Sequence, residues 1–256
     1  MATLQGFRDW ATTKGFPEGA RLSYIAPDIF IELSPLKPML EIPTAAIATL
    51  QGFRDWATSD DFPDGVRISF IGQELFIEMS PEELNKHNPI KFEISSIIGQ
   101  FVKRHKLGRF FMDGTLLTND LANLSTEPDG IFASWESIKS GRVQLVPRKF
   151  RPGEAIELQG TPDWVFEVVS LRSKRKDTKV LRETYHRAGI PEYWLINALD
   201  EDLNFQLLRH QPEGYVAEAT HDGWLHSHVF GIDVRLVQTR DELDTWQYTL
   251  EIADRP

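Results

Sequence analysis

Cysteine is absent from the 256 residues of the chain, and basic residues are fewer than acidic ones. Without cysteine the chain has no disulfide framework, no cysteine-ligated zinc site and no thiol nucleophile. No apolar run approaches the roughly 20 residues that a membrane helix requires, and the N-terminus lacks the basic and apolar segments of a secretory signal. We therefore expect a cytoplasmic protein with no membrane partner.

The composition is typical of a globular protein. Hydrophobic residues make up 41% and charged residues 26% of the chain, and 16 Phe and 7 Trp can build a substantial core. The 28 basic and 38 acidic residues give a formal charge of −10. This balance argues weakly against a protein that coats nucleic acid, but it allows an enzyme with one local basic surface.

An internal repeat occupies the N-terminal part of the chain. The segment ATLQGFRDWAT occurs at residues 2–12 and again at 48–58, and the similarity continues at the same spacing to Pro35 and Pro81. Two copies are too few for a solenoid, which requires at least three. Each copy predicts a short helix and a hairpin, with strands at 67–71 and 75–79 in the second copy.

Only the second copy is followed by a long helical pattern. Ser80 and Glu83 have the spacing of a capping box at its start. Its apolar stripe consists of Ile90, Ile94, Ile97, Ile98 and Phe101. We therefore assign 1–47 to an N-terminal extension, 48–238 to the main domain and 239–256 to an acidic tail, for which a helix is one option.

The remaining patterns predict an α/β or α+β domain with a mixed sheet. The apolar run at 164–169 is typical of a central strand covered on both faces. A helix at 176–188, ended by Gly189, and a strand at 192–196 complete a βαβ-like unit. Further expectations are one interrupted strand at 109–117, a polar loop at 119–127, strands at 129–133 and 142–146, a basic loop before residue 164, and antiparallel strands at 203–237.

One acidic residue, Glu167, lies inside the apolar run. Burial of an unpaired carboxylate is costly, so Glu167 either lies at an exposed strand end or has a partner. Asp129, at the start of another strand, is the candidate partner, because Asp163 is about 13 Å away along the same strand. Two carboxylates at adjacent strand ends are hard oxygen ligands suited to Mg²⁺ or Mn²⁺.

Basic residues are concentrated just after Glu167. Between 171 and 187 the chain has seven basic residues against two acidic ones. Such a cationic segment beside two carboxylates suits the binding of phosphate. The alternative is a solvated amphipathic helix, which is what most charge runs are.

Several short motifs occur in the same order as in one known family. They are Phe76–Pro81, His87, Pro128-Asp129, Phe166–Ser170, Asp177, Tyr185 and the segment RAGIPEYWLI at 187–196. In these the chain resembles the Uma-two family of restriction endonucleases, of the PD-(D/E)xK superfamily, over roughly residues 50–236. The resemblance implies a restriction-endonuclease-like mixed β-sheet flanked by helices, and cleavage of DNA that depends on Mg²⁺ or Mn²⁺.

The resemblance also implies roles for individual residues. It assigns metal binding to Asp129 and Glu167, with the backbone carbonyl of Val168 as a further ligand. Two positions where the family carries lysine are Val169 and Leu181 here. Lys176 or Lys179 could replace that lysine from the following helix.

Three questions stay open in the sequence. The chain is either a metal-dependent endonuclease or a catalytically inactive nuclease-fold module that binds nucleic acid or protein. His87 either touches substrate or a metal-bound water, or holds its helix against the sheet by a hydrogen bond. The first repeat copy is either a structural extension or exchanges with a neighbouring chain, which would make a homodimer.

Overall fold

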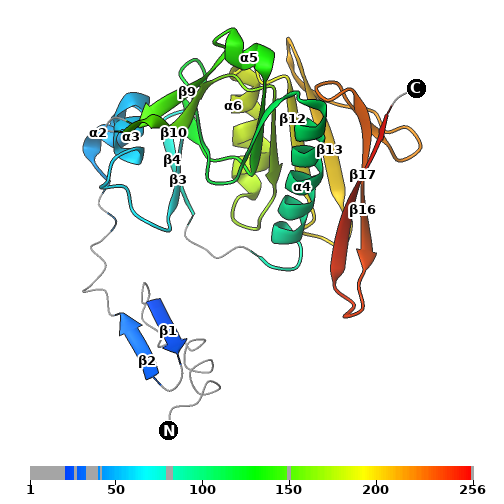
Figure 1. Cartoon of the computed structure of the whole chain (residues 1–256), viewed down its shortest axis with the longest axis horizontal. Coiled ribbons are helices and arrows are strands. Elements are labelled where there is room, and N and C mark those ends of the chain that lie inside the picture. Colours follow the sequence, from blue (N-terminus) through cyan, green and yellow to red (C-terminus); the bar gives the residue numbers. More distant parts are fainter. Residues whose placement is uncertain are drawn as a thin grey trace. The chain divides into compact units, whose positions relative to one another are not determined.

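The computed structural model describes residues 21–25, 28–32, 40, 42–78, 83–148 and 151–254. These form two units, Met1–Pro43 and Thr44–Pro256. The larger unit is a mixed α/β domain with several β-sheets and few helices (Figure 1). Within the described ranges, no helix has the length and apolarity needed to cross a membrane.

Two six-stranded sheets form the larger unit. The first sheet has the strand order β4 (Glu74–Glu78), β3 (Arg67–Ile71), β7 (Leu124–Thr126), β6 (Leu116–Asn119), β10 (Arg151–Gly160), β9 (Val143–Arg148). The second sheet has the order β14 (Gly214–Ala217), β13 (Asn204–Gln211), β12 (Glu192–Asn197), β11 (Trp164–Val168), β8 (Gly130–Ser134), β5 (Gly108–Met112). Each sheet is mixed, since β10 runs parallel to β6 and β11 parallel to β12.

A third sheet and six helical segments complete this unit. The third sheet is β15 (Leu225–Ser227), β16 (Ile232–Arg240) and β17 (Trp246–Asp254). The helical segments are α2 (Thr44–Ala48), α3 (Leu50–Ala57), α4 (His87–His105), α5 (Trp135–Lys139), the π-helix η1 (Lys176–Leu181) and α6 (Arg182–Arg187).

Side-chain alternation along β11 divides the core into two clusters. Trp164, Phe166 and Val168 pack with α4 and the third sheet on one face of the second sheet. Figure 1 shows α4 beside β16 and β17. Val165 and Val169 pack on the other face with η1, α6 and residues of the first sheet. All five residues of β11 are buried, as the apolar run predicts for a strand covered on both faces.

The βαβ unit around β11 is confirmed. η1 and α6 connect β11 to the parallel strand β12, whose register pairs Glu167 with Leu195. Gly189 follows the helix at φ 73°, a conformation that glycine adopts without strain. The first part of the predicted α-helix is a π-helix, however, which changes the faces on which its residues lie.

The start of α4 was predicted too early. The helix begins at His87, and Pro89 fits its first turn, where no intrahelical donor is required. The carboxylate of Glu83 accepts hydrogen bonds from the backbone N–H groups of Asn85, Lys86 and His87 at 2.7–3.0 Å. Ser80, the expected cap, lies outside the described residues. The apolar stripe of α4 is confirmed, because its residues pack into the core.

Several strand predictions were wrong. Residues 109–117 do not form one interrupted strand, since β5 and β6 belong to different sheets. The expected polar loop contains β7, whose buried Ser125 and Thr126 bond to neighbouring hydroxyls rather than pack as apolar residues. The expected basic loop contains β10. The acidic tail is the strand β17, which pairs along β16 from Arg240 to Ile232, and not a helix.

The smaller unit contains a hairpin that matches the hairpin of the second copy residue by residue. β1 (Arg21–Ile25) and β2 (Asp28–Glu32) pair antiparallel, from Arg21 opposite Glu32 to Ile25 opposite Asp28. β3 and β4 pair from Arg67 opposite Glu78 to Ile71 opposite Glu74. The repeated sequence therefore gives the same register in both copies.

Candidate active site

A cavity of about 780 Å³ lies at the ends of β8 and β11. Residues of β3, β4, the start of α4 and the segment from β11 into η1 form its walls. Its charged lining residues are Arg67, Glu78, Glu83, Lys86, His87, Glu127, Asp129, Glu167, Arg172, Lys176 and Asp177. The cavity thus brings together both predicted carboxylates and one of the two candidate lysines.

Asp129 and Glu167 come from neighbouring antiparallel strands. The register pairs Phe166 with Gly130, so the two acidic residues stand one position beyond the last pair. Both side chains lie on the sheet face of Ile131 and Val165, because side chains alternate along a strand. Their exposed fractions are only 3% and 4%.

Gly130 permits this close approach of β8 to β11. A Cβ at position 130 would lie 2.3 Å from the ring of Phe166, which is closer than atoms can pack. The absence of a side chain at position 130 lets the ring of Phe166 pack against β8, on the sheet face opposite to Asp129. Any larger residue would displace the strand end that carries the carboxylate.

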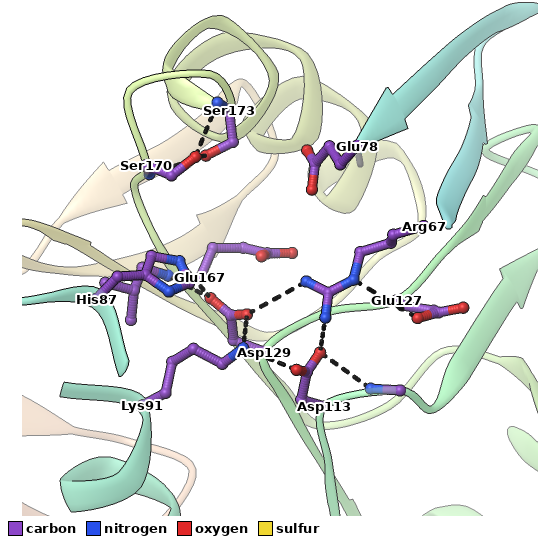
Figure 2. A network of polar contacts seen from close by, with 12 residues as sticks. Arg67, Glu78, His87, Lys91, Asp113, Glu127, Asp129, Glu167, Ser170 and Ser173 are labelled. Carbon is purple, nitrogen blue, oxygen red and sulfur yellow. Dashed lines mark hydrogen bonds and ion pairs between the residues drawn. The ribbon is translucent and has the colours of Figure 1, made fainter. Parts of the chain in front are cut away.

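Asp129 is the centre of a polar network (Figure 2). Its Oδ2 accepts a hydrogen bond of 2.7 Å from the backbone N–H of Val168. Its Oδ1 lies 3.1 Å from Nζ of Lys91 and 4.0 Å from Nη1 of Arg67. Lys91 and Arg67 also form ion pairs of 2.7 and 2.6 Å with Asp113. The cations compensate for the burial of Asp129.

Glu167 lies in a less compensated environment. The hydroxyl of Tyr185, a residue of α6, donates a hydrogen bond of 2.6 Å to its Oε1. Burial raises the pKa of Glu167 well above its usual value, and the negative charges of Asp129 and Asp177 raise it further. A divalent cation in the cavity would lower this pKa, since it favours the charged carboxylate.

Lys176 faces the cavity from the π-helix. Its Nζ lies 2.6 Å from Oε1 of Glu78 and 3.7 Å from Oδ1 of Asp177. Burial alone would lower the pKa of Lys176, but the carboxylates of Asp177, Glu167 and Glu78 raise it above its usual value. The lysine is therefore a fixed positive charge on the wall of the cavity.

Asp177 is buried beside Lys176. Burial raises the pKa of Asp177 to about 7, although Lys176 opposes this shift. Its Oδ1 is buried and finds no hydrogen-bond partner in the described part of the chain. Such an unsatisfied acceptor is costly and suits a site that receives a further ligand.

The other candidate residues lie in different places. Lys179 is exposed and does not line the cavity, because three steps along the π-helix turn it away from Lys176. Val169 is buried in the cavity wall, where the family carries lysine. Leu181 is fully buried in the core. Of the two candidate lysines, the fold brings Lys176 alone to the cavity.

His87 lies close to Asp129 at the start of α4. Its Nε2 is 3.9 Å from Oδ2 of Asp129, and its Nδ1 is buried with no hydrogen-bond partner among the described residues. The imidazole therefore lacks the hydrogen bond at Nδ1 that a helix anchor would use. Glu93, in contrast, accepts a hydrogen bond of 2.8 Å from the backbone of Leu250 and supports β17.

Three charged residues of the network were missed by sequence reasoning. Arg67 begins a strand whose alternation predicts structure rather than chemistry. Lys91 lies beside the apolar stripe of α4 and resembles an ordinary surface lysine of a helix, yet its exposed fraction is 7%. Asp113 lies in a turn after β5. No motif links the three, because only the tertiary fold brings them together.

The residues fit a hard divalent cation in part. Asp129 and Glu167 supply carboxylate oxygens, which Mg²⁺ prefers. Within the described ranges, no group of three or more His, Asp or Glu side chains is placed to hold a metal ion. A cation here would therefore need a backbone carbonyl and water in addition to the two carboxylates.

Comparisons with known proteins agree with the motifs. The fold is similar to the crystal structure of a "putative nuclease" from Anabaena variabilis, with a TM-score of 0.51 and 20% sequence identity, covering 71% of this chain and 90% of that chain. A search of curated proteins gave no significant match. The model of the Uma2 family, described as "Putative restriction endonuclease", matches residues 50–236, and the chain belongs to this family.

Proposed function

We propose that this protein is a metal-dependent endonuclease that hydrolyses phosphodiester bonds of DNA. The observation that carries the proposal is the meeting of Asp129, Glu167 and Lys176 in one cavity. Two buried carboxylates beside a buried cation are an arrangement suited to phosphoryl transfer. The similarity of the fold to the "putative nuclease" of Anabaena variabilis and the membership of the Uma2 family support the same reaction.

In this proposal Asp129 and Glu167 would hold Mg²⁺ or Mn²⁺, with the backbone carbonyl of Val168. The N–H of Val168 points to Asp129, and in an extended strand the carbonyl of the same residue points to the same side. When bound, the cation would polarise a phosphoryl oxygen and make water more acidic. Tyr185 keeps Glu167 oriented toward this position by its hydrogen bond.

Lys176 would take the role of the lysine that is missing at Val169 and Leu181. Its ammonium can stabilise the charge that develops on the phosphate in the transition state. Glu78 orients the ammonium from β4. Arg172, Lys174, Arg175 and Lys179 are exposed around this end of the molecule and would contact the nucleic acid backbone.

The second candidate is a catalytically inactive module that binds nucleic acid. The observation that favours it is the contact of 3.1 Å between Lys91 and Asp129, in which an ammonium neutralises a predicted metal ligand. Such a site could recognise a nucleic acid by its basic surface without cleaving it. This candidate predicts binding that does not depend on divalent cations.

The experiment that separates the two is cleavage of plasmid and single-stranded DNA with Mg²⁺ or Mn²⁺. We expect cleavage by the wild type and none by Glu167→Ala, because no other group would replace this ligand. The matched control is Glu93→Gln, a carboxylate that supports β17 outside the cavity. Wild-type activity in Glu167→Ala would overturn the proposal, and metal-independent binding without cleavage would favour the inactive module.

A further inference from the structure

The repeated N-terminal segment contains a second set of site residues. We name residues 2–35 copy 1 and residues 48–81 copy 2. In the larger unit copy 2 forms α3, β3 and β4 and contributes Arg67 and Glu78 to the cavity. At the corresponding positions copy 1 carries Arg21 and Glu32.

Copy 2 is held in place by three kinds of contact. The first is core packing: Phe53 and Phe70 are fully buried, with ring centroids 5.7 Å apart. The second is an ion pair of 2.7 Å between Arg54 and Glu157. The third is the pairing of β3 with β7, which places Ile71 opposite Leu124.

Copy 1 has matching residues for each of these contacts. The sequence LQGFRDWA at residues 4–11 is identical to that of α3, so Phe7 and Arg8 match the two α3 residues named above. Its hairpin has the same register as β3 and β4, and Ile25 stands where copy 2 has Ile71. Two differences favour copy 2. Tyr24 adds a hydroxyl at the buried position of Phe70, and Pro27 stands where copy 2 has Gln73 at φ 74°, a conformation closed to proline.

The shared register also gives copy 1 a counterpart of the Arg67 and Glu78 pair. β1 and β2 place Arg21 opposite Glu32, as β3 and β4 place Arg67 opposite Glu78. Arg67 pairs with Asp113 near Asp129, and Glu78 pairs with Lys176. A hairpin of copy 1 in the same position would therefore offer the same two charges to the same partners.

We propose that copy 1 is a second, complete occupant of the position of copy 2, and that it can replace copy 2 within the same chain. The connection to α4 is long enough, since Glu32 precedes His87 by 55 positions and Glu78 by 9. The longer loop disfavours copy 1 by roughly fifteen-fold if the two copies pack equally well. Copy 1 is thus the minor occupant in the full chain.

The first test removes the competition. Deleting residues 36–81 joins Pro35 to Glu82 and places copy 1 directly before α4, as Pro81 does for copy 2. We expect a cooperative urea transition for this variant, as for the variant lacking residues 1–46. Phe7→Ala in the deletion of 36–81 and Phe53→Ala in the deletion of 1–46 should lower the urea midpoint to a similar extent. A variant lacking 36–81 that does not fold would overturn the proposal.

The second test uses the full chain, which has no cysteine. Ile71→Cys with Leu124→Cys joins positions that face each other across β3 and β7 and should form an intramolecular disulfide. Ile25→Cys with Leu124→Cys should form the same intramolecular bond at least about fifteen times more slowly, because it traps the minor occupant and Tyr24 disfavours that occupant further. Tyr24→Phe should accelerate it.

Three outcomes contradict the proposal in this second test. The first is a complete absence of the disulfide between positions 25 and 124. The second is formation of this disulfide at the same rate as a disulfide between Ile25→Cys and Leu243→Cys, an exposed control position. The third is a disulfide that links two chains. The last would mean exchange between copies of the protein. None of these readouts requires that the protein cleaves nucleic acid.

Discussion

The backbone N–H of Val168 donates a 2.7 Å hydrogen bond to Oδ2 of Asp129. The next residue, Val169, donates instead to the carbonyl of Ile196 on β12. The backbone N–H of Val168 therefore points toward β8, beside which Asp129 lies, and the backbone N–H of Val169 points toward β12. The same strand end that carries Glu167 thus fixes the orientation of Asp129, so the two carboxylates are positioned as a unit.

Lys176 and Lys179 make a matched pair for testing catalysis. Lys176→Met should lower the cleavage rate by about 10²–10³-fold, the scale of one electrostatic stabiliser removed from a transition state. Lys179→Met should leave the cleavage rate at saturating DNA unchanged and should weaken binding, with a smaller salt dependence, because Lys179 is exposed. Single-turnover cleavage and salt-dependent binding assays distinguish the two effects. Equal losses in the two variants would contradict the assignment of Lys176.

The buried ion pair between Arg54 and Glu157 should stabilise α3 in its position. The side chains are 12% and 3% exposed, and the pair is bidentate, with bonds of 2.7 and 3.0 Å. Glu157→Leu removes both bonds, leaves Arg54 with a 3.7 Å contact to the exposed Asp120, and should lower the free energy of unfolding by on the order of 2–4 kcal/mol. The double variant Arg54→Met, Glu157→Leu should recover most of this loss. Urea unfolding tests both, and additive losses would show that the pair does not interact.

The stability of the metal-free protein should fall as pH rises, because of Asp177. Burial raises the pKa of Asp177 to about 7 in the folded state. Between pH ~4 and ~7 the unfolded chain has lost this proton while the folded protein keeps it, so the free energy of unfolding decreases by up to about 1.4 kcal/mol per pH unit. Glu167, whose pKa burial also raises, keeps its own contribution, so Asp177→Asn should remove the Asp177 part of the slope in urea unfolding. Asp222→Asn, at an exposed left-handed position, is the control that should keep it.

Deletion of residues 1–46 should leave a folded domain. The larger unit begins at Thr44, so the deletion also removes the first three residues of α2. It keeps Thr49, which caps α3 by accepting a hydrogen bond of 3.0 Å from the N–H of Gly52. All the named contacts of α3, β3 and β4 lie within this unit. We expect one cooperative thermal transition with a midpoint within a few degrees of the full chain. Aggregation or a broad transition would show that the first copy belongs to the core.

Elements whose apolar residues recur with the period of a helix or a strand could be predicted from the sequence. The stripe of α4 and the apolar run of β11 follow from periodicity, because each faces a hydrophobic cluster. β7 could not be found this way, because its buried Ser125 bonds to Thr118 on β6 and has no apolar signature. β17 follows Asp241, Glu242 and Asp244, so this end of the chain resembles an acidic tail until the pairing of β17 with β16 is known.

The site residues that could be predicted from the sequence are those whose chemistry differs from that of their neighbours in the chain. Glu167 conflicts with an apolar strand, and Asp129 follows from a motif at a strand start. Lys91 and Arg67 conflict with nothing nearby in the sequence, so their contacts with Asp129 became visible only in the fold. The choice between Lys176 and Lys179 also required the fold, since it depends on the π-helix.

The most direct test of the central claim is a crystal of the full chain soaked in Mn²⁺ and measured at the manganese absorption edge. We expect an anomalous difference peak with carboxylate oxygens of both Asp129 and Glu167 at about 2.0–2.3 Å, and no peak there in Glu167→Gln. A saturated soak with no peak between these carboxylates, while the wild type cleaves DNA in Mn²⁺, would contradict it.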